Sequence, residues 1–393
     1  MKIALYVHAL AATGVVRNIR LLADDFRARG HDVELLTALP GGDGVVGVPH
    51  HALLPGAGGS RLLQKWRAMP RLNAHLRRSR PDLLLSAGNH GHLTALIGSR
   101  TLPGLRRIYR ISNDLRRAAP GTPRNRMATV GRALMTRLLA ADADHLVLVS
   151  PTLGNGIPAF ASATVIENGI DIATVRARAN APSPHGWLDD GIPIVIAIGR
   201  LAPQKNFTTL LDAFALLRNA GTQARLIILG ESRDQARCAL QDRAAALGIA
   251  DDLLLPGVVD NVFPWLIGAS TFILPSWWEG SANVLLEAMA LDIPVIASRS
   301  AGNAASVLAD GRHGLLVDPA DPAAMAQAMA RQIDPDTALS PGDRIAAYGL
   351  DATLHRWAML VDGIVPRCRR APDRLSPVLS HDRSQPDPSP HNP

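Results

Sequence analysis

Two short blocks in the second half of the chain carry side chains that suit a diphosphate. The first, residues 199–206, reads Gly-Arg-Leu-Ala-Pro-Gln-Lys-Asn and lies between a predicted buried strand and a predicted helix. Arg200 and Lys205 therefore project from one strand-to-helix loop. Two fixed cations beside a helix N-terminus favour the binding of a diphosphate. The competing interpretation is an exposed basic pair, although the chain contains only three lysines.

The second block, residues 279–287, reads Glu-Gly-Ser-Ala-Asn-Val-Leu-Leu-Glu. Glu279 follows a predicted strand, Asn283 opens the next helix, and Glu287 falls about one turn later. Between them are three small residues, Gly280, Ser281 and Ala282, which let a ligand approach the backbone. Free N–H groups at the helix start suit an anion, and carboxylates accept hydrogen bonds from hydroxyl groups. This combination suits a polyol attached to a phosphate; alternatively, the two glutamates serve a helix terminus and a surface ion pair.

Alternating strands and helices must position these blocks. In the first half, the predicted strands are 2–9, 32–37, 82–86, 107–111, 145–150 and 164–167. In the second half they are 193–199, 224–230, 252–256, 271–276, 294–298 and 314–317. Helical spacing of apolar residues marks 15–29, 207–220, 234–247, 283–291, 304–309 and 322–331. Strand–helix–strand units imply parallel sheets, so the expected fold is α/β, with two doubly wound, Rossmann-like domains facing across a cleft.

The predicted domain limits follow from this alternation. We expect an N-terminal Rossmann-like domain over residues 1–171, a linker over 172–191 and a C-terminal Rossmann-like domain over 192–365. Residues 366–393 contain seven prolines and are predicted to be a disordered tail.

A series of motifs in the second domain occurs in a characteristic order. Gly-Arg-Leu-x-Pro-x-Lys-Asn is followed by Leu-Gly-Glu at 229–231, Leu-Pro-Gly-Val at 255–258 and Pro-Ser-x-x-Glu-Gly with the second glutamate. In the first domain, residues 167–171 read Glu-Asn-Gly-Ile-Asp. The sequence resembles the family four glycosyltransferases, retaining enzymes of the GT-B fold, over most of residues 2–331.

The resemblance implies that the first domain takes the acceptor and that the second binds a nucleotide-sugar donor. It also implies a role for each matching residue. Arg200 and Lys205 would hold the donor diphosphate, and Glu287 would bind the ribose. Glu279 would hold the sugar, together with Gly280, Ser281, Ala282 and Asn283. Gly14 would approach the phosphates, and the loop containing Val258 would line the base pocket. Glu279, Arg200 and Lys205 are thus the expected catalytic residues, and no metal or cofactor is expected.

The first domain departs from the family pattern. Many members carry a histidine after a first-domain strand, whereas residues 109–114 here read Tyr-Arg-Ile-Ser-Asn-Asp. Asn113 or Ser112 is expected in that place, or His90 reaches the same cleft. For His90 and His92, an ordinary pair of loop histidines is the simpler interpretation.

Charge is divided unequally along the chain. Residues 1–180 hold 24 Lys+Arg and 11 Asp+Glu, and the remainder holds 17 and 23. Residues 61–80 are basic without an acid and include Trp66. Such a stretch suits an anionic membrane surface, and solvated helix faces are the alternative. With two cysteines and no long apolar run, we expect a cytoplasmic protein, peripheral on the inner face of the membrane.

The expected activity is transfer of a sugar from a nucleotide-sugar donor, expected to be a UDP-sugar, to a hydroxyl of a glycan or lipid-linked glycan. A nucleotide-sugar epimerase of related fold is the alternative. A basic nucleic-acid-binding protein is suggested only by the pI of 10.2. This function is disfavoured because the sequence contains no compact nucleic-acid recognition motif. A dinucleotide dehydrogenase is disfavoured because no Gly-x-Gly-x-x-Gly follows the first strand.

Overall fold

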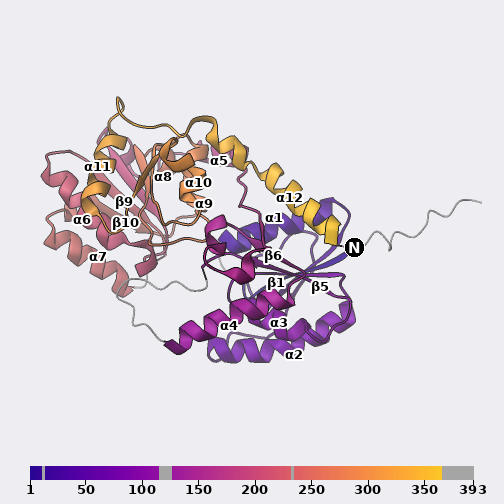
Figure 1. Ribbon diagram of the computed structural model, residues 1–393. Coiled ribbons are helices and arrows are strands. Elements are labelled where there is room, and N and C mark those ends of the chain that lie inside the picture. Colours follow the sequence, from indigo (N-terminus) through magenta and orange to yellow (C-terminus); the bar gives the residue numbers. More distant parts are fainter. Residues whose placement is uncertain (11–13, 115–125, 232–233, 365–393) are drawn as a thin grey trace, which may run out of the picture.

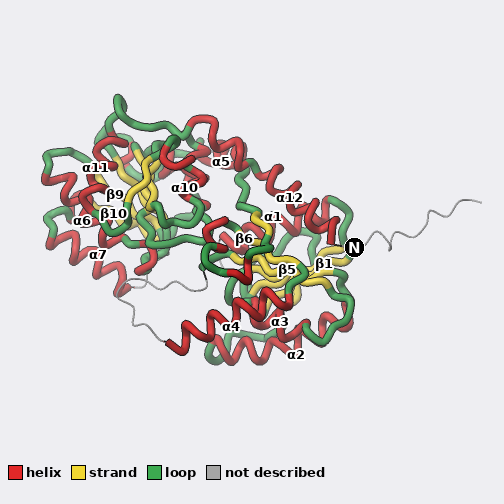
Figure 2. Tube along the Cα trace, viewed as in Figure 1, coloured by secondary structure: helices red, strands yellow, loops and turns green. Residues whose placement is uncertain are grey.

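The computed structural model describes residues 1–10, 14–114, 126–231 and 234–364, which form two α/β lobes (Figures 1 and 2). Each lobe holds a parallel sheet between helices, as the alternation of elements predicts. The tail predicted for 366–393 lies outside the described residues.

The first lobe contains a seven-stranded parallel sheet in the described part of the chain. Across the sheet, the strands are β3 (His50–Ala52), β2 (Asp32–Thr37), β1 (Lys2–Val7), β4 (Leu83–Ala87), β5 (Arg106–Ile111), β6 (His145–Leu148) and β7 (Thr164–Val165). β1 and β4 are neighbours, although the chain forms β2 and β3 on the other side of β1 between them. The order therefore reverses at β1, which is where parallel sheets bind ligands.

Helices cover both faces of this first sheet. They are α1 (Gly14–Ala28), α2 (Arg61–Ser79), α3 (His92–Ser99), α4 (Arg126–Asp142) and α12 (Leu350–Ile364). Ile3 and Leu5 pack with α1 and α12, whereas Ala4 and Tyr6 face α2 and α3. Because successive strand residues point to opposite faces, an unbroken apolar strand gives each helical layer its own core.

The second lobe repeats this arrangement with six parallel strands among the described residues. The strand order is β10 (Leu253–Gly257), β9 (Arg225–Leu229), β8 (Ile194–Ile198), β11 (Thr271–Leu274), β12 (Val295–Ser298) and β13 (Leu315–Val317). One face packs on α6 (Phe207–Asn219), α7 (Asp234–Ala246) and α11 (Pro322–Ile333). The other packs on α5 (Ile172–Ala179), α8 (Phe263–Ile267), α9 (Asn283–Ala290) and α10 (Ala304–Val307).

Two segments differ from the sequence-based interpretation. Residues 172–191 were expected to be a linker, but α5 is a helix whose cap residue Asp171 accepts from Thr174 N at 2.9 Å. Its residues Val175 and Ala179 are buried in the second core. Helix α12 lies in the range assigned to the second domain, yet Trp357 and Val361 are buried against the first sheet. In Figure 1 this yellow helix returns to the indigo lobe.

Candidate active site

The carboxyl ends of β8 and β11 define the candidate site in the second lobe. These neighbouring strands lie where the strand order reverses, so the loops that follow them diverge and leave room for a ligand. The loop after β8 carries Arg200 and Lys205, and the loop after β11 carries Glu279 and leads into α9. The fold therefore brings the two predicted blocks together.

Lys205 and Glu279 are in direct contact. The Lys205 Nζ donates to Glu279 Oε1 at 2.6 Å, and the Ser276 hydroxyl donates to the same oxygen at 2.7 Å. The lysine side chain lies over Gly199, where an added Cβ would come within 2.7 Å of the lysine Cε. Gly199 thus allows this ion pair to form close to the backbone.

Asn206 fixes the loop that carries the two cations. It is buried, has a left-handed backbone with φ of 59°, and donates from Nδ2 to the Pro275 and Pro319 carbonyls at 3.1 and 2.7 Å. Asparagine tolerates this conformation better than most residues. Gln204 also donates to the Trp278 carbonyl at 2.8 Å. The loops after β8 and β11 are therefore held together independently of the ion pair.

Gly280 brings the second lobe against the first. A Cβ on Gly280 would lie 1.8 Å from the Ser112 carbonyl oxygen and 2.9 Å from the Asn113 Cα. Gly302 lies next to Gly280, and its carbonyl oxygen accepts a hydrogen bond from Thr152 Oγ1 of the first lobe at 3.0 Å. Asn113, one of the predicted first-domain groups, thus lies beside the predicted sugar-binding loop.

The start of α9 contacts the first lobe through amides. Asn168 Nδ2 donates to Asn283 Oδ1 at 2.6 Å, and a Cβ on Gly14 would lie 2.5 Å from Asn283 Nδ2. Asn303 accepts from the Ala282 N–H at 3.3 Å and donates to Glu167 at 2.9 Å. The structure therefore places Gly14, Ala282 and Asn283 at one interface between the lobes.

Glu287 faces a cation that the sequence analysis does not single out. It is 7% exposed and forms an ion pair with Arg17 of α1. Burial raises the pKa of Glu287, and the charge of Arg17 opposes that rise. Arg17 lies one turn into the helix after β1, and this position is the signal that could have marked it.

His90 lies among cations of the first lobe. Its Nε2 is 3.5 Å from the Arg61 guanidinium. Burial, followed by the charges of Arg61 and Lys65, lowers the pKa of His90 to about 4, and His8 and Arg200 contribute in the same direction. Of these charged residues, Arg200 belongs to the opposite lobe.

Arg110 is a buried cation behind this interface. It is 2% exposed, donates to Ser112 Oγ at 3.1 Å, and hydrogen-bonds Asn168 Oδ1. Burial lowers the pKa of Arg110 to about 10. Since Asn168 in turn donates to Asn283, the guanidinium orients an amide chain that ends at the start of α9.

Some predicted features lie apart from this group. Val258 is 72% exposed in the loop after β10, two strands from β8. Ser281, by contrast, contacts the group, because its hydroxyl donates to Asn283 Oδ1 at 3.5 Å. His92 is buried and bonds Ser86 Oγ at 2.9 Å, away from solvent. A hollow of about 710 Å³ beside Arg100 and Asp144 lies at the amino edge of the first sheet.

The chain contains two Asp-x-Asp pairs, at residues 142–144 and 334–336, and both lie away from the candidate site. Members of each pair accept hydrogen bonds from other residues. Asp142 accepts from the Tyr109 hydroxyl at 2.6 Å, and Asp144 pairs with Arg106 at 2.7 Å. Asp334 accepts from the Asp336 N–H at 3.0 Å, after α11. No pair of this type projects toward Lys205 and Glu279 among the residues described.

Two doubly wound sheets meet at their carboxyl edges, with a basic and an acidic loop at the reversal of the second. This arrangement defines an α/β protein of the GT-B class. Residues 192–334 match the family described as glycosyl transferases group 1, and residues 12–174 match glycosyltransferase family 4. The chain belongs to the group 1 glycosyltransferases, a family of enzymes.

Curated relatives match over part of their length. The lipopolysaccharide core biosynthesis glycosyltransferase LpsE of Rhizobium meliloti is 33% identical over 43% of this chain and 45% of its own. A D-inositol 3-phosphate glycosyltransferase of Acidothermus cellulolyticus is 32% identical over 51% of this chain and 46% of its own. The matches thus span less than half the length of these relatives.

Solved structures share the fold over nearly the whole chain. A sucrose-phosphate synthase of Thermosynechococcus elongatus has a TM-score of 0.77 and 22% identity, covering 92% of this chain and 98% of its own. Anabaena HepE, solved with UDP and glucose, has a TM-score of 0.76 and 18% identity over 92% and 100%. In the described residues, no helix combines the length and apolar character that crossing a membrane requires.

Proposed function

We propose that the protein transfers a sugar from a nucleotide-sugar donor to an acceptor hydroxyl, with retention and without a metal. The contact between Lys205 Nζ and Glu279 Oε1, at the start of α9, carries this proposal. It joins a cation suited to the donor phosphates with a carboxylate suited to sugar hydroxyls. Arg200 adds a second cation on the same loop.

Charge stabilisation supplies the chemistry in this proposal. When the sugar–phosphate bond breaks, the bonding electron pair remains on the phosphate oxygen, and negative charge grows on the leaving nucleoside diphosphate. Arg200, Lys205 and the N–H groups at the start of α9 stabilise that charge. The acceptor oxygen forms the new bond to the sugar carbon and passes its proton to the leaving phosphate oxygen on the same face. Glu287, on the same helix, is assigned to the donor ribose.

Two further observations bear on the base of the donor and on the acceptor. HepE structures that share the fold were solved with UDP and with UDP-glucose, which supports UDP as the first donor nucleotide to test. On the acceptor side, His90 lies 3.5 Å from the Arg61 guanidinium, and the charges of Arg61, Lys65 and His8 all lower its pKa. Both ring nitrogens of His8 are buried without a hydrogen-bond partner. This set suits an acceptor that carries a phosphate near its reacting hydroxyl.

Nucleotide binding and donor turnover test the proposed function. UDP and UDP-sugars should raise the melting temperature of the chain, by an amount that grows with ligand concentration. The Arg200→Ala, Lys205→Ala and Glu279→Gln variants should each release UDP about 10²–10³-fold more slowly. Arg312→Ala, on the exposed surface of the second lobe, is the matched control. Full activity in the three folded variants would exclude this site.

Association with an anionic membrane is a further part of the proposal. The first turns of α2 expose Leu62 by 60% and Trp66 by 58%, between Arg61 and Arg67. Apolar side chains flanked by arginines favour the boundary between headgroups and acyl chains. The acceptor-side cations lie on the same end of α2. A lipid-linked acceptor would thus be presented beside the site.

Flotation with vesicles tests this association. The chain should float with vesicles that contain anionic lipid, and high salt should release it. A Leu62→Ser, Trp66→Ser variant should float several-fold less, whereas Met359→Ser, which alters an exposed residue of α12, should behave as wild type. Equal recovery of all three proteins in the lower fraction would refute membrane association without affecting the donor site.

A further inference from the structure

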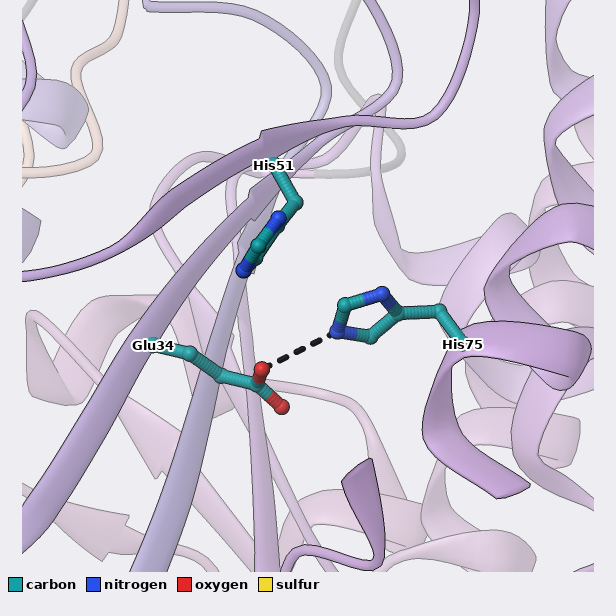
Figure 3. A group of neighbouring side chains, drawn as sticks. All are labelled: Glu34, His51 and His75. Atoms are coloured by element: carbon teal, nitrogen blue, oxygen red, sulfur yellow. Dashed lines mark hydrogen bonds and ion pairs between the residues drawn. The ribbon is translucent and has the colours of Figure 1, made fainter. Parts of the chain in front are cut away.

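Two histidines and a glutamate meet at the β3 edge of the first sheet, which is opposite to the β7 edge. Figure 3 shows the three side chains. Glu34 comes from β2, His51 from the edge strand β3 and His75 from α2. His51 is paired with Leu36 in the strand register, and Leu36 lies on the same face as Glu34. The register therefore directs Glu34 and His51 toward the face that α2 covers.

The donor atoms of these side chains lie close enough to share an ion. One ligand atom from each residue lies within 4.8 Å of the others. The His75 Nε2 is 3.0 Å from Glu34 Oε2, and the His51 and His75 ring centroids are 4.9 Å apart. Zinc binds imidazole nitrogens and carboxylate oxygens at about 2.0–2.2 Å. His51 is exposed, so rotation of its side chain can bring its nitrogen to that distance.

Glu34 supplies an independent observation that points to a ligand. Its side chain is 5% exposed, and its Oε1 is buried without a hydrogen-bond partner. Within the described ranges, its ion-pair partner is His75, and no lysine or arginine pairs with it. A buried carboxylate that uses only one oxygen is costly, and a cation would remove that cost.

We propose that Glu34, His51 and His75 bind one zinc ion, with water completing a tetrahedral site. Two neutral imidazoles and one carboxylate are a donor set that suits zinc, and the exposed side of His51 leaves room for the water. The ion would join β3, which has three residues, to β2 and α2. Because these residues lie within the elements and not at the carboxyl edge, the role assigned to zinc is structural.

Cobalt and zinc titrations of the full chain test this site. After treatment with a chelator, wild type should bind about one equivalent of cobalt with the visible absorption of a tetrahedral ion, and zinc should displace it. The His51→Ala and Glu34→Gln variants should bind zinc at least about tenfold more weakly. His50→Ala is the matched control, because His50 bonds Thr37 at 2.9 Å and lies outside the cluster.

Thermal unfolding gives a second readout that does not depend on activity. Zinc should raise the melting temperature of wild type and of His50→Ala, and leave that of His51→Ala unchanged. Since His51 is exposed, this variant is expected to fold. Equal zinc affinity in wild type and His51→Ala, or no cobalt spectrum in wild type, would overturn the proposal.

Discussion

Lys205 and Glu279 form an ion pair in the structure. In the proposed function, the donor would therefore displace Glu279 from Lys205 when its phosphates bind the lysine. The pair is nearly buried, with side-chain exposures of 17% and 12%. A diphosphate offers Lys205 a doubly charged partner, and the released Glu279 remains held by Ser276 at 2.7 Å. In the proposed function, the ion pair therefore keeps both side chains in place before the donor arrives, which lowers the ordering cost of binding.

His92 links the stability of the first lobe to pH. It is buried against Tyr109, and burial lowers the pKa of His92 to about 3. In the unfolded chain its pKa is about 6.5. Between these values the unfolded chain binds a proton that the folded chain does not, so stability falls as the pH falls from about 6.5 toward 3.

The His92→Asn variant should show a weaker dependence of stability on pH. Asparagine retains a polar partner for Ser86 but takes up no proton. Urea unfolding from pH 7.5 to 4.5 should give a slope lower than that of wild type by up to about 1.4 kcal/mol per pH unit. Identical slopes in the two proteins would show that His92 already titrates freely in the folded state.

The sequence predicts the position of some site residues and not of others. Lys205 and Glu279 could be predicted to meet, because each follows a strand of the same parallel sheet. Arg110 could not, because an arginine at the end of a strand is usually solvated, and only the fold shows that it is buried against Asn168. The proximity of His51 and His75 could not be predicted either, because it depends on the strand register and on the packing of α2 against the sheet.

At the scale of elements, α12 joins the two lobes. The chain returns from the second lobe, and Trp357, 2% exposed, packs into the core beneath the first sheet. Truncating Trp357 to alanine should destabilise the first lobe by about 3–5 kcal/mol, because it removes a large buried side chain. Hydrogen exchange should show the loss of protection in β1 and α1, and less change in β8 and β9.

Met359 provides the control on the same helix. Its side chain is 63% exposed, so Met359→Ala should change the stability by no more than about 0.5 kcal/mol. If Trp357→Ala loosened the second sheet and left β1 protected, α12 would belong to the second lobe in solution.

The prediction of elements succeeded where burial leaves a simple pattern. The buried parallel strands are apolar runs bounded by turn residues, so β2 was predicted to its observed ends and β8 to within one residue at each end. β3 was missed because His50-His51-Ala52 has no strand-like alternation of apolar residues. α5 has a short apolar face, and its helical form depends on packing against α8 and α9.

At the scale of the whole molecule, the two carboxyl edges meet through small residues and amides. Gly280 contacts Ser112, and Asn168 contacts Asn283, so the lobes approach each other closely at the proposed sugar site. A side chain at position 280 cannot be accommodated by rotation, because its Cβ would lie 1.8 Å from the Ser112 carbonyl oxygen. Close approach of the lobes therefore requires glycine at this position.

Gly280→Ala should hold the lobes apart without unfolding either of them. The variant should keep the wild-type melting temperature to within a few degrees, yet show a larger radius of gyration by small-angle scattering. Sugar transfer should fall by at least about tenfold, because a misplacement of 1 Å at a reacting centre costs up to about 10²-fold. Gly186→Ala is the matched control, since a Cβ there meets no atom within 4 Å. An unchanged radius together with full transfer would mean that the lobes work without this contact.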